Sequence, residues 1–231
     1  MKLLVVGAQG GSLGAAVKEL AQESAFGWEV YTAGISGQED EKVNLAHSPQ
    51  RDLEALVRAV RPDHIVCTVG VNQPRRAYSG TDDWYQDHFA ANVIGPMRLL
   101  DAWLAYGPDG DVPWQHFVGI SSNSAGIPRS SSAAYCASKA ALSMALRVRA
   151  RDCAGANLSV SVYGYEPGLL AGTPMTAEAA ERFNGPLTRM KGAAVEHGLS
   201  VYGVAGHIVR NIAFGGPELN GVLLRLDAGE V

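Results

Sequence analysis

Three side chains in this sequence have the types and spacing needed for proton transfer. Ser122 lies thirteen residues before Tyr135, and Lys139 follows Tyr135 by four residues. Residues four apart share one face of a helix, so Tyr135 and Lys139 can point into one cleft. A free tyrosine has a pKa of about 10, and a nearby fixed cation lowers it toward the range useful near neutral pH. The spacing predicts a site in which Ser122 holds a substrate oxygen and Tyr135 exchanges a proton with it.

A Tyr-x-x-x-Lys pair alone also arises by chance, so its meaning depends on its surroundings. The apolar run Phe117–Ile120 precedes Ser122 and is typical of a strand. The Ser122 hydroxyl is therefore expected at the carboxyl end of a strand, where open α/β sheets bind their ligands.

The amino-terminal segment predicts a strand, a glycine-rich turn and a helix in succession. The apolar run Lys2–Val6 leads into the turn and then into an amphipathic helix, Ala15–Ser24. Glycines there permit a tight turn and let a pyrophosphate approach the amides at the helix N-terminus. We take this loop as a nucleotide-binding element, the alternative being a tight turn without a ligand. Its residues are Gly7, Ala8, Gln9, Gly10, Gly11, Ser12, Leu13 and Gly14.

Strands and helices alternate along the rest of the chain. This alternation predicts an α/β fold with a doubly wound parallel sheet, because right-handed crossovers place helices on both faces. The expected strands are Leu3–Val6, Glu29–Ala33, Lys42–Leu45, His64–Val69, His116–Ile120, Ser159–Tyr163 and Val222–Leu226.

With these motifs in this order, the chain resembles the short-chain dehydrogenase/reductase family over nearly its full length. The helix residue Asn92 matches the family's relay asparagine, and Pro167-Gly168 matches the pair beside the nicotinamide. Thr173 follows as a candidate contact for the cofactor's carboxamide or phosphate. Two departures stand out: the last glycine of the loop falls at Gly14, one residue late, and only Gly70 remains of the usual Asn-Asn-Ala-Gly.

The resemblance implies a single Rossmann-type domain over residues 1–231, with a substrate lid around 169–199. It also implies an NAD(P)-dependent oxidoreductase that moves a hydride between the cofactor and a carbonyl or secondary alcohol. Tyr135 would be the proton donor or acceptor, Ser122 would orient the oxygen, and Asn92 would complete the relay. Lys139 would lower the tyrosine pKa and, with Tyr135, contact the cofactor.

The cofactor type depends on the residue that ends the second expected strand. Dinucleotide folds that prefer NAD carry an acid there for the ribose 2′-hydroxyl, and this chain has Gly34. Without that acid a 2′-phosphate is repelled less, and Ser36 can hydrogen-bond it, so the sequence favours NADP(H) over NAD(H). No arginine or lysine stands near Gly34, and the acidic run Glu39–Glu41 follows closely. Asn44 is a candidate for contact with the adenine.

Two other functions remain open. The irregular glycine loop and the missing acid also fit a non-catalytic dinucleotide sensor or regulatory module, although such a protein needs no Ser122, Tyr135 and Lys139. A lyase or epimerase that uses bound cofactor without net redox change is the second alternative. Substrate identity does not follow from the fold, beyond a small carbonyl or alcohol compound.

Composition narrows the class of protein further. The 231 residues are 47% hydrophobic and 18% charged with a net charge of −4, which indicates one buried core and no nucleic-acid surface. Three cysteines in no ligand spacing and six dispersed histidines predict neither disulfides nor a metal site. No leader or membrane-spanning stretch is recognisable, so we expect a cytoplasmic protein. Small side chains along the Tyr135 helix predict a homodimer or homotetramer.

Overall fold

The structure is a computed structural model that describes residues 1–8, 12–35, 39–75, 79–106, 112–176 and 198–227. It contains a seven-stranded sheet in the order β3-β2-β1-β4-β5-β6-β7, in which every neighbouring pair is parallel. The strands are β1 (Lys2–Val6), β2 (Glu29–Gly34), β3 (Glu41–Lys42), β4 (His64–Cys67), β5 (Gln115–Ile120), β6 (Val160–Pro167) and β7 (Leu223–Leu226).

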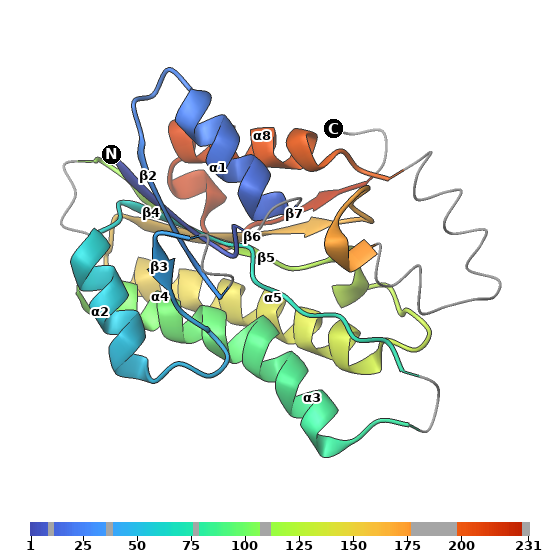
Figure 1. The fold of residues 1–231 in the computed structure, drawn as a ribbon. Helices are drawn as coiled ribbons and strands as arrows, with labels where there is room; N and C mark the ends of the chain where they lie inside the picture. Colours follow the sequence, from blue (N-terminus) through green and yellow to red (C-terminus); the bar gives the residue numbers. More distant parts are fainter. Residues whose placement is uncertain (9–11, 36–38, 76–78, 107–111, 177–197, 228–231) are drawn as a thin grey trace.

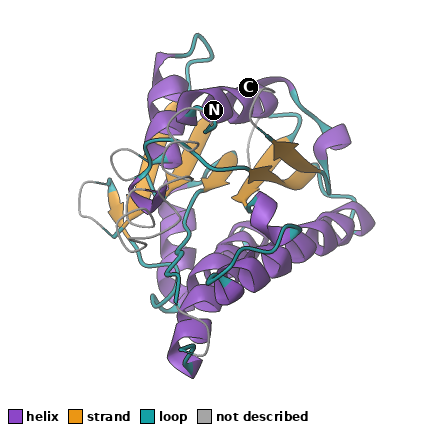
Figure 2. Ribbon diagram, turned by 90° about the vertical axis from the view of Figure 1, so that its right-hand side faces the viewer, coloured by secondary structure: helices purple, strands orange, loops and turns teal. Residues whose placement is uncertain are grey.

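Helices cover both faces of this sheet. In Figure 1, α1 and α8 lie on one face, whereas α2, α4 and α5 lie on the other, and Figure 2 shows the sheet between the two helical layers. The helices are α1 (Leu13–Glu23), α2 (Gln50–Val60), α3 (Asp82–Phe89), α4 (Gly95–Ala105), α5 (Ala133–Gly155) and α8 (Val201–Phe214). The predicted doubly wound parallel sheet is confirmed.

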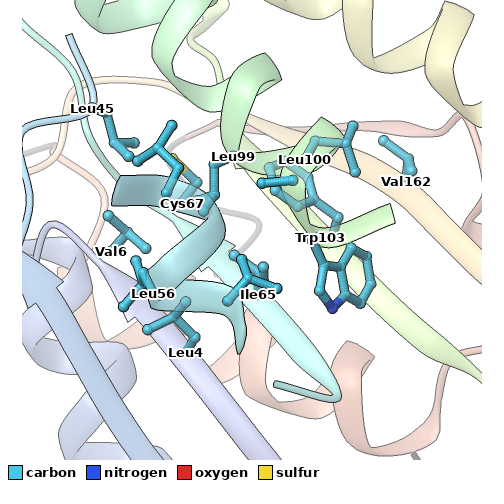
Figure 3. Close-up of a cluster of buried hydrophobic side chains, with 14 of the residues drawn as sticks. Leu4, Val6, Leu45, Leu56, Ile65, Cys67, Leu99, Leu100, Trp103 and Val162 are labelled. Carbon is cyan, nitrogen blue, oxygen red and sulfur yellow. The ribbon is translucent and has the colours of Figure 1, made fainter. Parts of the chain in front are cut away.

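Strand β1 shows how the sequence divides the core between the two layers. Successive side chains of a strand point to opposite faces, so an all-apolar strand must be covered on both. Leu4 and Val6 belong to the hydrophobic cluster on the α2, α4 and α5 side, and Leu3 and Val5 belong to the cluster under α1 and α8. Figure 3 shows the first cluster, in which Trp103 also packs.

The strand order places the candidate site. The chain runs outward from β1 through β2 to β3 and then returns to β4 on the other side of β1. The region beyond the carboxyl ends of β1 and β4, where the strand order reverses, is the usual ligand position in such sheets. The glycine turn follows β1, and the segment with Gly70 follows β4.

The seven strands differ from their predicted bounds by one or two residues at an end, and β3 and β6 differ by more. The third strand was expected over Lys42–Leu45, but β3 is only Glu41–Lys42, which pairs with Ala33 and Gly34. Strand β3 lies at the exposed edge of the sheet, so it pairs with a neighbouring strand, β2, on one side only. The sixth strand was expected to end at Tyr163 and instead continues to Pro167, because β5 and β7 both pair with it.

Candidate active site

The glycine turn after β1 is shaped by close contacts of its backbone. Gly7 has a φ of +91°, a conformation that L side chains rarely adopt. A Cβ built on Gly14 would lie 2.6 Å from the carbonyl oxygen of Gly7 and 2.6 Å from Oγ1 of Thr68. Ser12 caps α1 by accepting from the amide of Ala15. The late glycine therefore lets the first turn of α1 lie directly against the strand end.

Thr68 is a site residue that the sequence analysis missed. Its hydroxyl hydrogen lies within reach of the carbonyl oxygens of Val6, at 3.0 Å, and Gly7, at 3.1 Å. It thus joins the end of β4 to the start of the glycine turn, where the resemblance leads one to expect asparagine. A hydroxyl residue directly after a buried strand was the only available signal.

Ser122 and Tyr135 meet at the carboxyl end of β5. Ser122 begins the short 3-10 helix Asn123–Ala125 and accepts from the amide of Ser124 at 3.1 Å. Its side chain also hydrogen-bonds the Tyr135 phenol, which lowers the tyrosine pKa, while burial raises it by a larger amount. The net result is a raised pKa for Tyr135, so its phenol stays protonated at neutral pH.

Lys139 is buried one helical turn beyond Tyr135. Its side-chain Nζ donates to the carbonyl oxygen of Ile120 at 2.8 Å and lies 5.7 Å from the centre of the Tyr135 ring. Burial lowers the pKa of Lys139 to about 8, whereas the nearby Cys67 raises it slightly. At pH 7 the ammonium form still predominates by about ten to one. A buried cation therefore lies behind the phenol, although burial and not the cation dominates the tyrosine pKa in this structure.

Asn92 lies in a π-helical turn, Ala90–Ile94, between α3 and α4. Such turns occur frequently at functional sites. The Asn92 amide is fully buried and donates to Oγ of Ser138 at 2.9 Å, and Ser138 in turn donates to the carbonyl oxygen of Tyr135. A Cβ built on Gly70 would lie 3.1 Å from Nζ of Lys139 and 3.4 Å from Oδ1 of Asn92. The structure therefore brings together all four residues that the sequence analysis selected as catalytic.

A second polar network lies behind Lys139. Ser121 lies 3.0 Å from the carbonyl oxygen of Lys139 and 2.7 Å from Oγ of Ser143, which donates to a carboxylate oxygen of Glu166. Arg225 pairs with the other oxygen of Glu166 at 3.7 Å. These hydrogen bonds join the catalytic helix to the ends of β5 and β6, and no local pattern in the sequence indicates them.

At the end of β2 an acid takes the space that Gly34 leaves. A Cβ built on Gly34 would lie 2.5 Å from Oε1 of Glu39. The returning segment is fixed by Asp40, whose carboxylate accepts from both the amide and the hydroxyl of Thr32 at 2.7 and 2.9 Å. Ser36, the residue expected to meet a 2′-phosphate, lies outside the described residues.

The remaining predicted cofactor residues are only partly described. Asn44 lies in a turn beyond the short β3, and its Oδ1 accepts from the amide of Ala46. Pro167 ends β6, and the Gly168 amide donates to Leu226. Thr173 is buried and hydrogen-bonds Thr176. Gln9, Gly10, Gly11 and most of the expected lid, residues 177–197, lie outside the described residues.

Metal sites and membrane-spanning helices are two further features that bear on function. Within the part of the chain that the structure describes, no group of three or more His, Cys, Asp or Glu side chains is arranged to hold a metal ion. In the same residues, none of the helices combines the length and apolar character needed to cross a membrane.

Comparison with known proteins places this geometry in context. The family model for short chain dehydrogenases matches residues 1–183. No curated protein sequence matches the chain significantly. Among solved structures, an actinorhodin polyketide ketoreductase variant with NADPH is similar with a TM-score of 0.83 and 20% identity, over 99% of this chain and 96% of that one. A 4-hydroxyisoleucine dehydrogenase with NADH has a TM-score of 0.81 and 19% identity, over 100% and 98%.

A third similar structure is the L-sorbose reductase from Gluconobacter frateurii with NADPH and L-sorbose. Its TM-score is 0.76 and its identity 19%, over 100% of this chain and 96% of that one. At these identities the structures establish the shared fold, and the family match covers well over half of the chain. The protein therefore belongs to the short-chain dehydrogenase family, whose members are nicotinamide-dependent oxidoreductases.

Proposed function

We propose that Tyr135, Ser122, Lys139 and Asn92 are the catalytic residues of this oxidoreductase, and that its substrate is a small ketone, aldehyde or secondary alcohol. The observation that carries the proposal is the hydrogen bond between Ser122 and Tyr135 at the carboxyl end of β5, with the Lys139 cation buried behind it. A non-catalytic dinucleotide sensor has no use for this arrangement.

In the reducing direction, Tyr135 is the proton donor, since its raised pKa keeps the phenol protonated at neutral pH. The protonated phenol donates to the substrate oxygen as negative charge develops there, and the Ser122 hydroxyl orients the same oxygen. Lys139 stabilises the phenolate that results, because its ammonium lies on the same side of the site. Asn92 keeps the helix and the segment after β4 in register around these groups.

The residues around the glycine turn fit a dinucleotide. Gly7 and Gly14 let α1 begin directly at the end of β1, and the amides and helix dipole at the N-terminus of α1 favour a pyrophosphate. Tyr135, Lys139, Gly70, Pro167 and Gly168 would surround the nicotinamide end. When bound there, a nicotinamide cofactor supplies or accepts the hydride.

Our sequence-based expectation of NADP(H) depended on the absence of an acid at position 34, where Gly34 has no side chain to fill the space. The Glu39 carboxylate occupies that space, so negative charge lies beside the expected position of the ribose 2′-group. A carboxylate accepts a hydrogen bond from a 2′-hydroxyl and repels a 2′-phosphate. We therefore propose that the protein prefers NAD(H), in contrast to the expectation from sequence.

Calorimetric titration with NADH and NADPH tests this choice. Wild-type protein should bind NADH at least tenfold more tightly, and Glu39→Gln should remove most of the difference. Glu41→Gln is the matched control, because it removes the same charge from an exposed residue of β3. Tighter binding of NADPH by the wild-type protein would restore the original expectation.

We also propose a homodimer or homotetramer formed through α5. Its outward face carries exposed apolar side chains at helical spacing, including Ala137, Ala140, Met144 and Val148. Met144 is 58% exposed and Val148 is 49% exposed, which favours burial against a second copy. A monomeric mass in light scattering at micromolar concentration would refute the assembly. A cytoplasmic location stays a prediction.

The catalytic assignment is tested with a panel of ketones and the preferred cofactor. Ser122→Ala should lower kcat by about a hundredfold or more, since it removes an oriented hydroxyl from the reacting oxygen. Ser124→Ala, which removes a neighbouring buried hydroxyl, is the control and should retain turnover. Equal turnover in Ser122→Ala and wild type would exclude the proposed role of Ser122.

A further inference from the structure

The segment that follows β4 forms one wall of the candidate site. It contains Gly70, which has no side chain and lies close to Lys139 and Asn92. Its next residues, 71–75, have no regular secondary structure, although they leave the sheet at the edge where ligands bind. Something other than a neighbouring strand must therefore fix the position of this wall.

Three side chains from the helical region Asp82–Ile94 replace the missing strand. The Asn92 amide accepts from the backbone N–H of Val71 at 2.7 Å and donates to its carbonyl oxygen at 3.0 Å. Two residues on, His88 Nε2 accepts from the backbone N–H of Gln73 at 3.1 Å, and Trp84 Nε1 donates to its carbonyl oxygen at 2.7 Å. The backbone N–H and C=O groups of Val71 and Gln73 are thus all hydrogen-bonded, as those of alternate residues are beside a neighbouring strand in a sheet.

The spacing of the helix explains why this arrangement fits. Alternate residues of an extended chain lie about 6.6 Å apart, and residues four apart on a helix rise by about 6 Å. His88 and Asn92 are four residues apart, as are Trp84 and His88. One helical face can therefore meet the backbone at residues 71 and 73. We call Trp84, His88 and Asn92 the side-chain ladder.

The hydrogen bonds of His88 define its protonation state. Its Nδ1 lies 2.7 Å from the carbonyl oxygen of Trp84, which can only accept, so Nδ1 carries the hydrogen. Nε2 must then have a free lone pair to accept from Gln73. His88 is fully buried, and burial lowers its pKa, with Arg75 acting in the same direction and Asp87 and the Trp84 carbonyl opposing it. The imidazole is accordingly neutral at pH 7.

The ladder is continuous with the catalytic residues. Asn92 is both its last member and the donor to Ser138, which in turn donates to the carbonyl oxygen of Tyr135. Movement of residues 71–73 would therefore displace Gly70 beside Lys139 and disturb Asn92 from the other side. The fold alone does not require His88 or Trp84, because water can also hydrogen-bond the backbone groups of a surface segment.

We propose that His88 and Trp84 are positioning residues, which hold residues 71–73 in register so that Asn92, Gly70 and Lys139 keep the geometry of the catalytic site. They touch neither substrate nor cofactor in this role. The inference rests on the proposed function and extends it to two residues remote from the reacting atoms.

The test compares His88→Leu with His88→Gln, since glutamine supplies an oxygen that can accept from the Gln73 amide and leucine does not. His88→Leu should lower kcat about tenfold, with the KM for the ketone and the cofactor Kd changed less than twofold, and His88→Gln should recover most of the lost kcat. Amide hydrogen exchange gives an independent readout. Residues 71 and 73 should be protected in wild type and His88→Gln, and should exchange about tenfold faster in His88→Leu.

Trp84→Phe is a second variant, which removes only the donor to the Gln73 carbonyl and keeps the aromatic packing. It should also lower kcat more than it changes KM. Unchanged kcat in His88→Leu, with faster exchange at residues 71 and 73, would overturn the positioning role and leave the proposed function intact. A wild-type protein that turns over no ketone with either cofactor would overturn both.

Discussion

Replacing Lys139 by methionine should change the dependence of stability on pH in a way that follows from its burial. The ammonium is almost completely buried, and burial lowers its pKa from 10.5 to about 8. The unfolded chain therefore binds this proton more tightly than the folded protein does. The difference corresponds to about 3 kcal/mol of destabilisation whenever the lysine must be charged.

The sign of the effect defines the pH window. Below pH 8 the lysine is charged in both states and the full cost is present, whereas the cost disappears as pH rises from 8 to 10.5. Relative to Lys139→Met, the wild-type protein should therefore gain about 3 kcal/mol of unfolding free energy between pH 7 and pH 10.5. The variant also loses the hydrogen bond to the carbonyl oxygen of Ile120, a loss of about 1–3 kcal/mol that does not vary with pH.

Urea denaturation of both proteins at several pH values measures this difference. Titration of other groups contributes to both curves, so the subtraction isolates Lys139. Two parallel curves between pH 7 and pH 10.5 would refute the conclusion that Lys139 is held as a buried cation with a lowered pKa. Turnover of Lys139→Met should be lost at every pH, because no cation remains to stabilise the Tyr135 phenolate.

Three further outcomes are expected. Gly14→Ala should raise the cofactor Kd about tenfold or more and destabilise the protein by about 1–3 kcal/mol, because its Cβ would lie 2.6 Å from the Gly7 carbonyl oxygen; calorimetry and denaturation would show both effects. Thr68→Val should destabilise the same turn by about 1–3 kcal/mol in denaturation, since it removes the hydroxyl whose hydrogen lies within reach of the Val6 and Gly7 carbonyl oxygens. Burial lowers the pKa of His64 to about 3 and that of His116 to about 4. The free energy of unfolding should therefore fall by several kcal/mol as the pH falls from 6.5 toward 4, and it should fall less in the variant with phenylalanine at both positions.

Much of the architecture was predictable because its signals are local. The alternation of apolar runs with amphipathic helices indicates the parallel sheet, and the run before the glycine turn places the loop at the end of β1. The four-residue spacing of Tyr135 and Lys139 puts them on one helical face, and the strand before Ser122 puts the serine at the same edge. These relations depend on neighbours in the sequence.

The parts that were missed depend on long-range contacts. Thr68 meets the glycine turn across about 60 residues of chain, and His88 meets Gln73 across 15. The absence of an acid at Gly34 is visible in the sequence, but nothing in the sequence shows that Glu39 returns to lie beside it. Nor does any local pattern around Asn92 predict a π-helical turn. Hydrophobic periodicity indicates which face of a helix or strand is buried, but it does not indicate which distant polar group will hydrogen-bond to that helix or strand.

Tyr135 is, in our proposal, the proton donor of a hydride-transfer reaction. The most direct test of this role is single-turnover oxidation of bound NADH or NADPH by an active ketone, followed by nicotinamide absorbance in wild type and Tyr135→Phe. We expect the rate to fall by a hundredfold or more in the variant, with the cofactor Kd changed less than threefold. A rate close to that of wild type, with cofactor still bound, would contradict the assignment and move proton transfer to another group.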